Sequence, residues 1–499
     1  MARDSQLSRF SPTRGWSELF GWEVQRRDDT PIFRQLYLQI RGAILLRRLS
    51  PAARLPSTRA LARELAIART SVIAAYEQLM AEGYVSGRIG SGTYVSSELP
   101  DGIEAGPLRR KTSAVAQALP RQVQAFAALA PPPTLGADRP FDAGRTLVDA
   151  RTSAIWAKLS RRALASIDPV HLGYSDPRGL AGLRSTICDY LRATRAVDAE
   201  PDQIMVTSGA QQAIDITIRV LLGREFEAWV EDPCYGLTYQ ALAISGTRIH
   251  PIPVDAAGIQ VRKGIRAAPR ARVAFVTPSH QHPLGVVLSM TRRLELLSWA
   301  REARAWIVED DYDSEFRYSG RPLASLQGLD DGDRVIYVGT FSKALFPGLR
   351  LGYAVVPRGL VGAFAGARFL ADRHPPSLSQ VVLAEFMRQG HYASHIRRVR
   401  LAYRDARDGL VAQLETRLAE HITVASPDQG RHLIAALRKG LSDIAIERAA
   451  HDNGVTVRAI SGMYRKTAPR SGLMLGFAGF SHDRIVRAVS ILSRIIRAL

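Results

Sequence analysis

At 499 residues, the chain is too long for a single ordinary hydrophobic core, and two to four domains are expected. Hydrophobic residues make up 46% and charged residues 23%, which is typical of folded water-soluble proteins, and no apolar run reaches the roughly 18 residues that span a bilayer. The net charge of +20 favours a polyanionic partner, although arginine is spread along the whole chain and therefore locates no binding face.

Two features favour a cytoplasmic protein that does not attach to a membrane. The first residues carry charge but no apolar segment of a secretory signal. The two cysteines, Cys188 and Cys234, are too few for a disulfide framework, which suits a reducing compartment.

The first predicted domain spans residues 31–96 and follows an N-terminal extension, residues 1–30. Its first helix repeats apolar residues every four positions, at Ile32, Leu36, Ile40 and Ile44. A second helix starts at Ser57, and a third ends at Gly83. The stretch "YVSGRIGSGTYVS" predicts a hairpin. Helix, helix, turn, helix and hairpin is the order of a winged helix-turn-helix.

Residues 97–145 are predicted to form a linker. Clusters of proline and glycine such as "ALAPPPTLGADRP" flank an alanine-rich, helix-compatible stretch. A linker of this length lets the domains on either side move independently.

The remaining residues, 146–499, are predicted to form an α/β domain with a mainly parallel sheet. Short apolar runs such as "QIMVTSG", "ARVAFVTPSH", "AWIVEDDYD" and "RVIYVGTFSK" alternate with helical stretches such as "TRRLELLSWAREA". Ligands of such sheets bind at the carboxyl ends of the strands. Those ends carry Ser208, His280, Asp310 and Lys343.

The residue types at these strand ends suit pyridoxal 5′-phosphate. Lys343 can form a Schiff base with an aldehyde, and Asp310 can keep a pyridine nitrogen protonated. Tyr235 offers a flat face for stacking. A phosphate suits the helix start at Ser208, Gly209 and Ala210, and Arg350 can reach the same group.

Each of these residues alone has a plainer explanation. A lone lysine is usually a solvated surface charge, and an aspartate after a strand is usually a cap. The acidic run "EDDYDSE" also suits magnesium, but its place upstream of Lys343 favours the pyridoxal interpretation. His391 and His395 have metal-ligand spacing but no third ligand nearby, and no metal site is expected.

Longer motifs resemble known families over nearly the whole chain. Residues from about 145 to 499 resemble fold-type I aminotransferases through "YSDPRGLAGLR", "TSGAQQAID", "EDPCYG", "VEDDYDSEFRY" and "GTFSKALFPGLRLGY". Residues 31–95 resemble the GntR-type winged helix through "RLPSTRALARELAIARTSVIAAYEQLMAEGYVSGRIGSGTYV". The two in this order resemble the MocR-type regulators.

The resemblance implies a role for each matching residue. Lys343 would carry the cofactor as an internal aldimine, Asp310 would meet the ring nitrogen, Tyr312 the ring hydroxyl, and Tyr235 the ring face. The residues implied around the phosphate are Ser208, Gly209, Ala210, Thr340, Ser342 and Arg350. Tyr174 matches a tyrosine that reaches the phosphate of a neighbouring subunit, which implies a homodimer.

The chain departs from aminotransferases at three positions. His282 stands where an asparagine usually contacts the ring, and Met474 stands where an arginine usually binds the substrate carboxylate. Leu237 replaces an arginine that some relatives carry. Arg458 and Arg465 are candidate replacements for effector binding, although surface positions are the plainer explanation for both.

The predicted winged helix has nine arginines and three glutamates between Pro31 and Val95, a net charge of +6. Double-stranded DNA is the expected partner, with the third helix in the major groove. The candidate contacts are Arg59, Arg69, Thr70, Ser71 and, in the wing, Arg88. Phosphate contacts would make binding sensitive to salt.

The favoured hypothesis is a pyridoxal-phosphate-dependent transcriptional regulator. It would sense the cofactor, or an amine or amino-acid effector, through an aldimine at Lys343. The alternative is an active aminotransferase that carries a DNA-binding domain, against which Met474 counts. A DNA-binding protein with a vestigial cofactor site is disfavoured because Lys343, Asp310 and Arg350 all remain.

Overall fold

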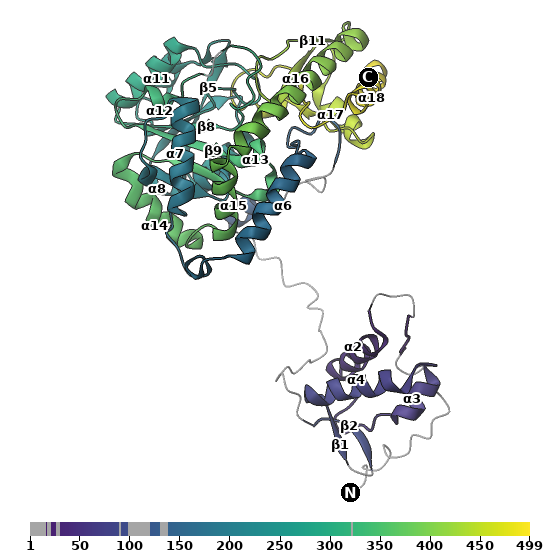
Figure 1. Cartoon of the computed structure of the whole chain (residues 1–499). Coiled ribbons are helices and arrows are strands. Elements are labelled where there is room, and N and C mark those ends of the chain that lie inside the picture. Colours follow the sequence, from purple (N-terminus) through teal and green to yellow (C-terminus); the bar gives the residue numbers. More distant parts are fainter. Residues whose placement is uncertain are drawn as a thin grey trace. The chain divides into compact units, whose positions relative to one another are not determined.

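The computed structural model describes residues 16, 21–25, 30–88, 91–97, 120–129, 138–320 and 323–499. The chain divides into two compact units, Met1–Leu119 and Pro120–Leu499 (Figure 1). Each unit is described by itself below.

The first unit is the winged helix-turn-helix that the sequence predicts. Its elements are α2 (Ile32–Leu45), α3 (Thr58–Glu64), α4 (Arg69–Ala81), β1 (Val85–Arg88) and β2 (Gly92–Val95). The Ser57 side chain caps α3 by accepting a hydrogen bond from the Ala60 amide at 3.2 Å. One core joins the three helices through Leu36, Leu61 and Leu79, all fully buried.

The hairpin of the first unit is antiparallel, with Val85 opposite Val95 and Arg88 opposite Gly92. Gly83, which follows α4, has a φ of +77°, a conformation that glycine adopts without strain. Residues 89–90, at the tip of the hairpin, lie outside the described residues, and so does the side chain of Arg88.

The second unit is built on an eight-stranded sheet in the order β3-β10-β9-β8-β7-β4-β5-β6. The pairs from β5 through β4, β7 and β8 to β9 are parallel, while β10 runs antiparallel to both β3 and β9. The prediction of a mainly parallel sheet is confirmed. The strands are β3 (Ile204–Thr207), β4 (Glu227–Asp232), β5 (Arg248–Asp255), β6 (Gly258–Ile259), β7 (Val273–Val276), β8 (Trp306–Asp311), β9 (Val335–Thr340) and β10 (Gly352–Val355).

Helices cover both faces of this sheet because its strands are apolar on both sides. One face packs against α8 (Ala210–Leu221), α9 (Gly236–Ser245) and α14 (Val361–Asp372). The other face packs in two parts against α6 (Ala150–Ala165), α7 (Ala181–Arg195), α15 (Ser377–Arg388), α10 (Val261–Ala267), α11 (Met290–Glu302) and α12 (Leu326–Leu329).

A smaller sheet follows the long helix α16 (His391–Leu418) (Figure 1). Its order is β11-β12-β14-β13, and all of its pairs are antiparallel. Its elements are β11 (Ile422–Val424), β12 (His432–Leu437), α17 (Asp443–Asp452), β13 (Arg458–Ala459), β14 (Gly472–Gly476) and α18 (His482–Ala498).

Part of the segment predicted as linker packs against the second unit. Phe141 is 1% exposed and belongs to the largest core, and its carbonyl accepts a hydrogen bond from the Gly476 amide at 2.9 Å. Helix α5 (Arg121–Ala127) contacts α9. No described helix is long and apolar enough to cross a membrane.

Because the first unit has a core of its own, its stability can be lowered separately. We expect Leu79→Ala to destabilise the first unit by about 2–5 kcal/mol, the usual effect of removing a fully buried leucine side chain. Scanning calorimetry of the full chain measures this as a lower transition temperature of that unit alone. Glu77→Ala, at an exposed position of the same helix, is the control. A matching shift of the second unit's transition would contradict separate cores.

Candidate functional site

The carboxyl ends of neighbouring strands bring the predicted residues together. Asp310 lies near the end of β8, and Lys343 lies in α13 (Phe341–Ala344), the single helical turn that follows β9. Strands β8 and β9 are parallel neighbours, with Asp310 opposite Val338. Ser208 and Gly209 follow β3, and Tyr235 follows β4.

Lys343 is held by a short capped turn. The Thr340 side chain accepts a hydrogen bond from the Ser342 amide at 3.2 Å, which starts the turn directly after the strand. Burial, together with the nearby charge of Arg431, lowers the pKa of Lys343 to about 8. A large fraction of neutral amine is therefore present near pH 8.

Asp310 has a buried oxygen without a partner. Among the described residues, its Oδ1 has no hydrogen-bond partner although it is buried. Burial, together with the neighbouring carboxylates Asp311 and Asp313, raises the pKa of Asp310 to about 7. A buried acceptor of this kind is costly unless a donor meets it.

Arg350 and the start of α8 form a second part of the site. Arg350 donates a hydrogen bond to the Ser208 carbonyl at 2.6 Å. Gly209 has a φ of +97°, and a Cβ there would lie 3.6 Å from Arg350 Nη1. Ala210 opens α8, a twelve-residue helix whose first amides have no helical partner. The Ser342 hydroxyl is buried and unpartnered among the described residues.

Aromatic rings line the space near Lys343 and Asp310. The centroid of the His282 ring lies 5.2 Å from that of Tyr235 and 6.1 Å from that of Tyr312. Burial lowers the pKa of His282 to about 3, so this ring is neutral. Burial raises the pKa of Tyr235, and the carboxylate of Asp310 raises it further.

A buried cluster of His280, Asp313 and His432 lies beside Tyr312, and the sequence assigned it no role. His280 Nδ1 lies 3.0 Å from Asp313 Oδ2 and 3.0 Å from the Tyr312 hydroxyl. The centroid of the His432 ring lies 4.8 Å from that of His280. His280 stands at a predicted strand end, but no motif points to His432, which is more than 100 residues away in the sequence.

Two nitrogens of the cluster already have hydrogen-bond partners. Donor atoms of the three side chains lie within 4.8 Å of one another, as in a metal site. However, His280 Nδ1 already bonds Asp313, and His432 Nε2 donates to the Pro283 carbonyl at 3.0 Å. His395 likewise contacts Thr152 and the Ala344 carbonyl, while His391 is 3.0 Å from Gln389.

The two candidate effector residues differ in their surroundings. Arg458 is exposed and lies opposite Met474 in the small sheet, and its charge acts on Lys343, His282 and Tyr235. The Arg465 guanidinium instead lies 4.6 Å from the centroid of the Tyr239 ring. Met474 is 4% exposed, and Leu237 is 43% exposed.

Tyr174 does not join the other predicted residues within this chain. It is 79% exposed, and its ring contacts His374 and Arg373. A hollow around it is lined by His171, Leu172, Gly173, Tyr174, His374 and Ser377.

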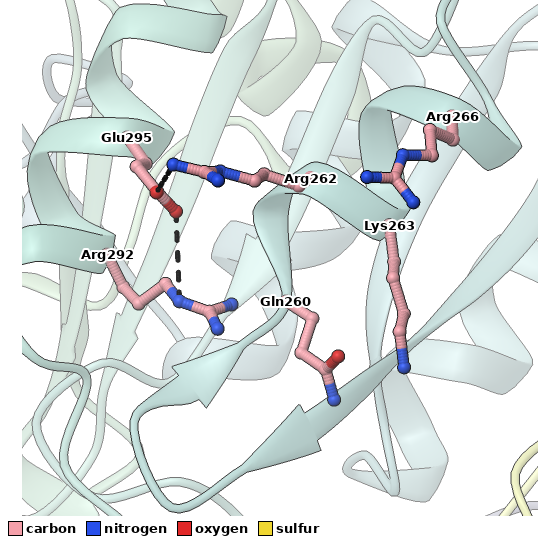
Figure 2. A pocket seen from close by; sticks show the side chains of 6 residues that line it. All are labelled: Gln260, Arg262, Lys263, Arg266, Arg292 and Glu295. Atoms are coloured by element: carbon pink, nitrogen blue, oxygen red, sulfur yellow. Dashed lines mark ion pairs between the residues drawn. The ribbon is translucent and has the colours of Figure 1, made fainter.

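Another hollow lies between α10 and α11 and contains none of the predicted residues (Figure 2). Arg262 and Arg292 both pair with Glu295, at 3.3 and 3.7 Å. Arg292 also pairs with Asp255 at 3.2 Å, so acidic side chains already meet two of the cations.

The candidate DNA contacts lie at two helix starts in the first unit. Arg59 lies in the first turn of α3, and Arg69 and Thr70 open α4; all three are exposed. Ser71 is partly buried. Arg69 Nε donates to the Thr58 hydroxyl at 3.3 Å, which links the two helix starts.

Two families match the chain. Aminotransferase class I and II matches residues 140–492, and bacterial regulatory proteins, gntR family, matches residues 33–95. The chain is 37% identical to the probable rhizopine catabolism regulatory protein MocR of Rhizobium meliloti, over 95% of this chain and 96% of that one. It is 32% identical to the pyridoxine biosynthesis transcriptional regulator PdxR of Corynebacterium glutamicum, over 92% and 94%.

The second unit is also similar to solved structures of aminotransferases. One is the α-aminoadipate aminotransferase LysN of Thermus thermophilus, complexed with N-(5′-phosphopyridoxyl)-L-leucine. It is 26% identical with a TM-score of 0.69, and the match covers 76% of this chain and 97% of that one.

The raised pKa of Asp310 predicts a pH-dependent stability of the cofactor-free protein. An aspartate of the unfolded chain titrates near 4, whereas Asp310 in the folded protein titrates at about 7. Between these values the folded state holds a proton that the unfolded chain has released. The stability that Asp310 contributes is therefore complete below about pH 4 and is lost as pH rises through 7.

Denaturant unfolding of wild type and Asp310→Asn between pH 4 and 8 measures this effect. We expect the free energy of unfolding of wild type, relative to the variant, to fall by a few kcal/mol over this range. Asp331→Asn, at an exposed position, is the control. Parallel pH profiles of wild type and Asp310→Asn would show that burial does not shift this carboxyl.

Proposed function

Because the chain belongs to the MocR-type regulators of the GntR family, a DNA-binding unit joined to an aminotransferase-like unit, we propose that Lys343 makes its second unit a sensor. The sensed molecule is pyridoxal phosphate itself, or an amine or amino acid that replaces Lys343 on the cofactor. The state of the site then changes how the first unit binds its operator.

Pyridoxal 5′-phosphate is the cofactor of the second unit. When bound, it supplies a reactive aldehyde on a ring that withdraws electrons. The observation that carries the proposal is a buried amine, Lys343, near a buried carboxylate oxygen of Asp310 that has no partner in the described part of the chain. Asp310 Oδ1 suits a protonated ring nitrogen, and the lowered pKa of Lys343 suits attack on an aldehyde.

The other strand ends suit the remaining parts of the cofactor. Arg350, the unpartnered Ser342 hydroxyl and the start of α8 offer donors to a phosphate. These donors, with Ser208, Gly209 and Thr340, form the proposed phosphate site. Tyr235 provides a flat ring for one face of the cofactor, His282 lies at 78° to that ring, and Tyr312 provides a hydroxyl for the ring oxygen.

For an effector with a carboxylate, Arg458 is the stronger of the two candidates. It lies directly across the small sheet from Met474, the position where aminotransferases carry an arginine, and its charge acts on Lys343. Arg465 is less suited because Tyr239 already covers its guanidinium group.

We further propose that the protein acts as a homodimer on double-stranded DNA. The hollow around Tyr174 and the exposed Val170 and Leu172 offer a surface for a second copy of the chain. A dimer would bring two first units to one operator, as is usual for helix-turn-helix proteins.

DNA binding is tested with the protein's own upstream DNA at several salt concentrations. We expect Arg69→Ala to weaken binding about tenfold and to reduce the salt dependence, because a phosphate or base contact is lost. We expect Arg59→Ala likewise to weaken DNA binding and to reduce its salt dependence. Arg161→Ala, an exposed arginine of α6, is the control. Equal binding of upstream and random DNA would contradict an operator-specific regulator.

The role of Lys343 is tested by visible absorption of the cofactor-loaded protein. We expect Lys343→Ala to lose the absorption band of covalently held cofactor, whereas Lys158→Ala, an exposed lysine of α6, keeps it. The wild-type band is then followed with a panel of amines and amino acids. A band that shifts and stays, together with altered DNA binding, supports a sensor.

The alternative function, an active aminotransferase that carries a DNA-binding domain, predicts a different outcome. Lys343 is positioned to move protons during such a reaction, which keeps this function open to test. The band would then shift and decay to that of the pyridoxamine form, and keto acid would accumulate over many turnovers.

A further inference from the structure

Three oxygens of Asp313 and Tyr312 lie within hydrogen-bonding distance of a single nitrogen, His280 Nδ1. His280 Nδ1 lies 3.2 and 3.0 Å from the two carboxylate oxygens of Asp313, and 3.0 Å from the Tyr312 hydroxyl. A single nitrogen carries either a proton or a lone pair. The arrangement of protons around it is therefore restricted.

The charge state of Asp313 determines whether His280 Nδ1 carries a proton or a lone pair. Burial alone would raise the pKa of Asp313, but its interactions with His280, His432 and Arg431 together outweigh burial, and the pKa lies below its ordinary value. The carboxylate is thus an acceptor only, and Nδ1 must carry the proton to meet it. His280 Nε2 agrees with this placement, because it is buried without a partner among the described residues, which suits a lone pair.

This placement leaves the Tyr312 proton free to point elsewhere. Burial raises the pKa of Tyr312 well above its ordinary value, so the phenol keeps its proton. A protonated Nδ1 cannot accept a hydrogen bond from the phenol, whose oxygen accepts a share of the N–H instead. The phenol proton is then directed away from His280.

The His280 ring is fixed in this position by its surroundings. Gly430 has a φ of +86°, and a Cβ there would overlap the ring. A Cβ at Gly285 would lie 3.1 Å from His280 Nε2. His432 covers another side of the ring and is itself held by the Pro283 carbonyl. The charged or titratable groups around His280, Asp313 and Tyr312 include His432, His282, Arg431, Asp310 and Glu231.

We propose that Asp313 and His280 are positioning residues that fix the direction of the Tyr312 hydrogen bond, so that the phenol donates to the ring oxygen of the cofactor. This inference rests on the proposed function, in which Tyr312 meets that oxygen. It adds that the donor character of Tyr312 is imposed by a carboxylate that never touches the cofactor.

The first test uses the cofactor-free protein. In a sample labelled with ¹⁵N-histidine, we expect a proton bound to His280 Nδ1, with a strongly downfield resonance that His280→Asn identifies by its loss. In Asp313→Asn we expect that proton to move wholly or partly to Nε2. A wild-type His280 with its proton on Nε2 alone would overturn the proposal, whatever the cofactor does.

The second test uses the pH midpoint of the visible band in the loaded protein. A hydrogen bond donated to the ring oxygen weakens that oxygen's hold on the proton it shares with Lys343 Nζ. Tyr312→Phe should therefore raise the midpoint by about one pH unit, the usual size for a lost hydrogen bond to a charged group. The Asp313 charge raises the pKa of Lys343, so its loss alone should lower the midpoint, whereas release of Tyr312 should raise it. The change caused by Asp313→Asn should therefore be more positive in the wild-type background than in Tyr312→Phe, where only the charge is lost.

Three variants separate positioning from general disruption. His280→Asn retains an N–H donor near the place of Nδ1 and should keep a midpoint near that of wild type, whereas His280→Leu should not. Glu315→Gln removes a nearby carboxylate that contacts Tyr392 rather than His280, and it should leave the midpoint unchanged.

The outcomes distinguish this inference from the proposed function. If Tyr312→Phe raises the midpoint and Asp313→Asn changes it equally in the wild-type and Tyr312→Phe backgrounds, the positioning role is wrong while the contact of Tyr312 with the cofactor stands. If Tyr312→Phe leaves the midpoint unchanged, the contact itself is wrong and the inference falls with it. Loss of the band in Lys343→Ala tests cofactor attachment independently of both.

Discussion

The parallel pairing of β8 with β9 is the constraint on which the site depends. Because these strands run in the same direction, their carboxyl ends meet at one edge, where Asp310 and the turn carrying Lys343 lie. An amine and a carboxylate in that position are both partly removed from water. Burial lowers the pKa of the first and raises that of the second, so each is closer to neutrality than it would be on the surface.

The surroundings of this pair explain why the site suits one kind of ligand. Asp310 Oδ1 suits a hydrogen-bond donor, and Lys343 suits an aldehyde. Arg350 and the start of α8 suit an anion. A single flat molecule with these three groups satisfies all of them at once. Met474, where the resemblance to aminotransferases implies an arginine, lies in the small sheet and not at the strand ends that form this frame.

Much of this frame could be predicted from the sequence, because it depends on local patterns. Helix periodicity around Leu36 and strand ends such as that before Lys343 are read from a few neighbouring residues. The antiparallel direction of β10 and the packing of Phe141 depend on contacts between distant segments, and no local pattern encodes them. The contact of His432 with His280 could not be predicted for the same reason, because 151 residues separate them in the printed sequence.

Arg431 connects the cofactor edge with the segment that leads into α6, at Ala143 and Arg145. Its guanidinium group is buried and donates to the carbonyls of Ala143 and Arg145, at 2.9 and 2.8 Å. The same charge repels a protonated Lys343. Loss of the charge on Lys343 relieves this repulsion at a side chain that also holds the backbone of Ala143 and Arg145. The lysine at the sheet edge and the segment that leads into α6 therefore share one buried cation.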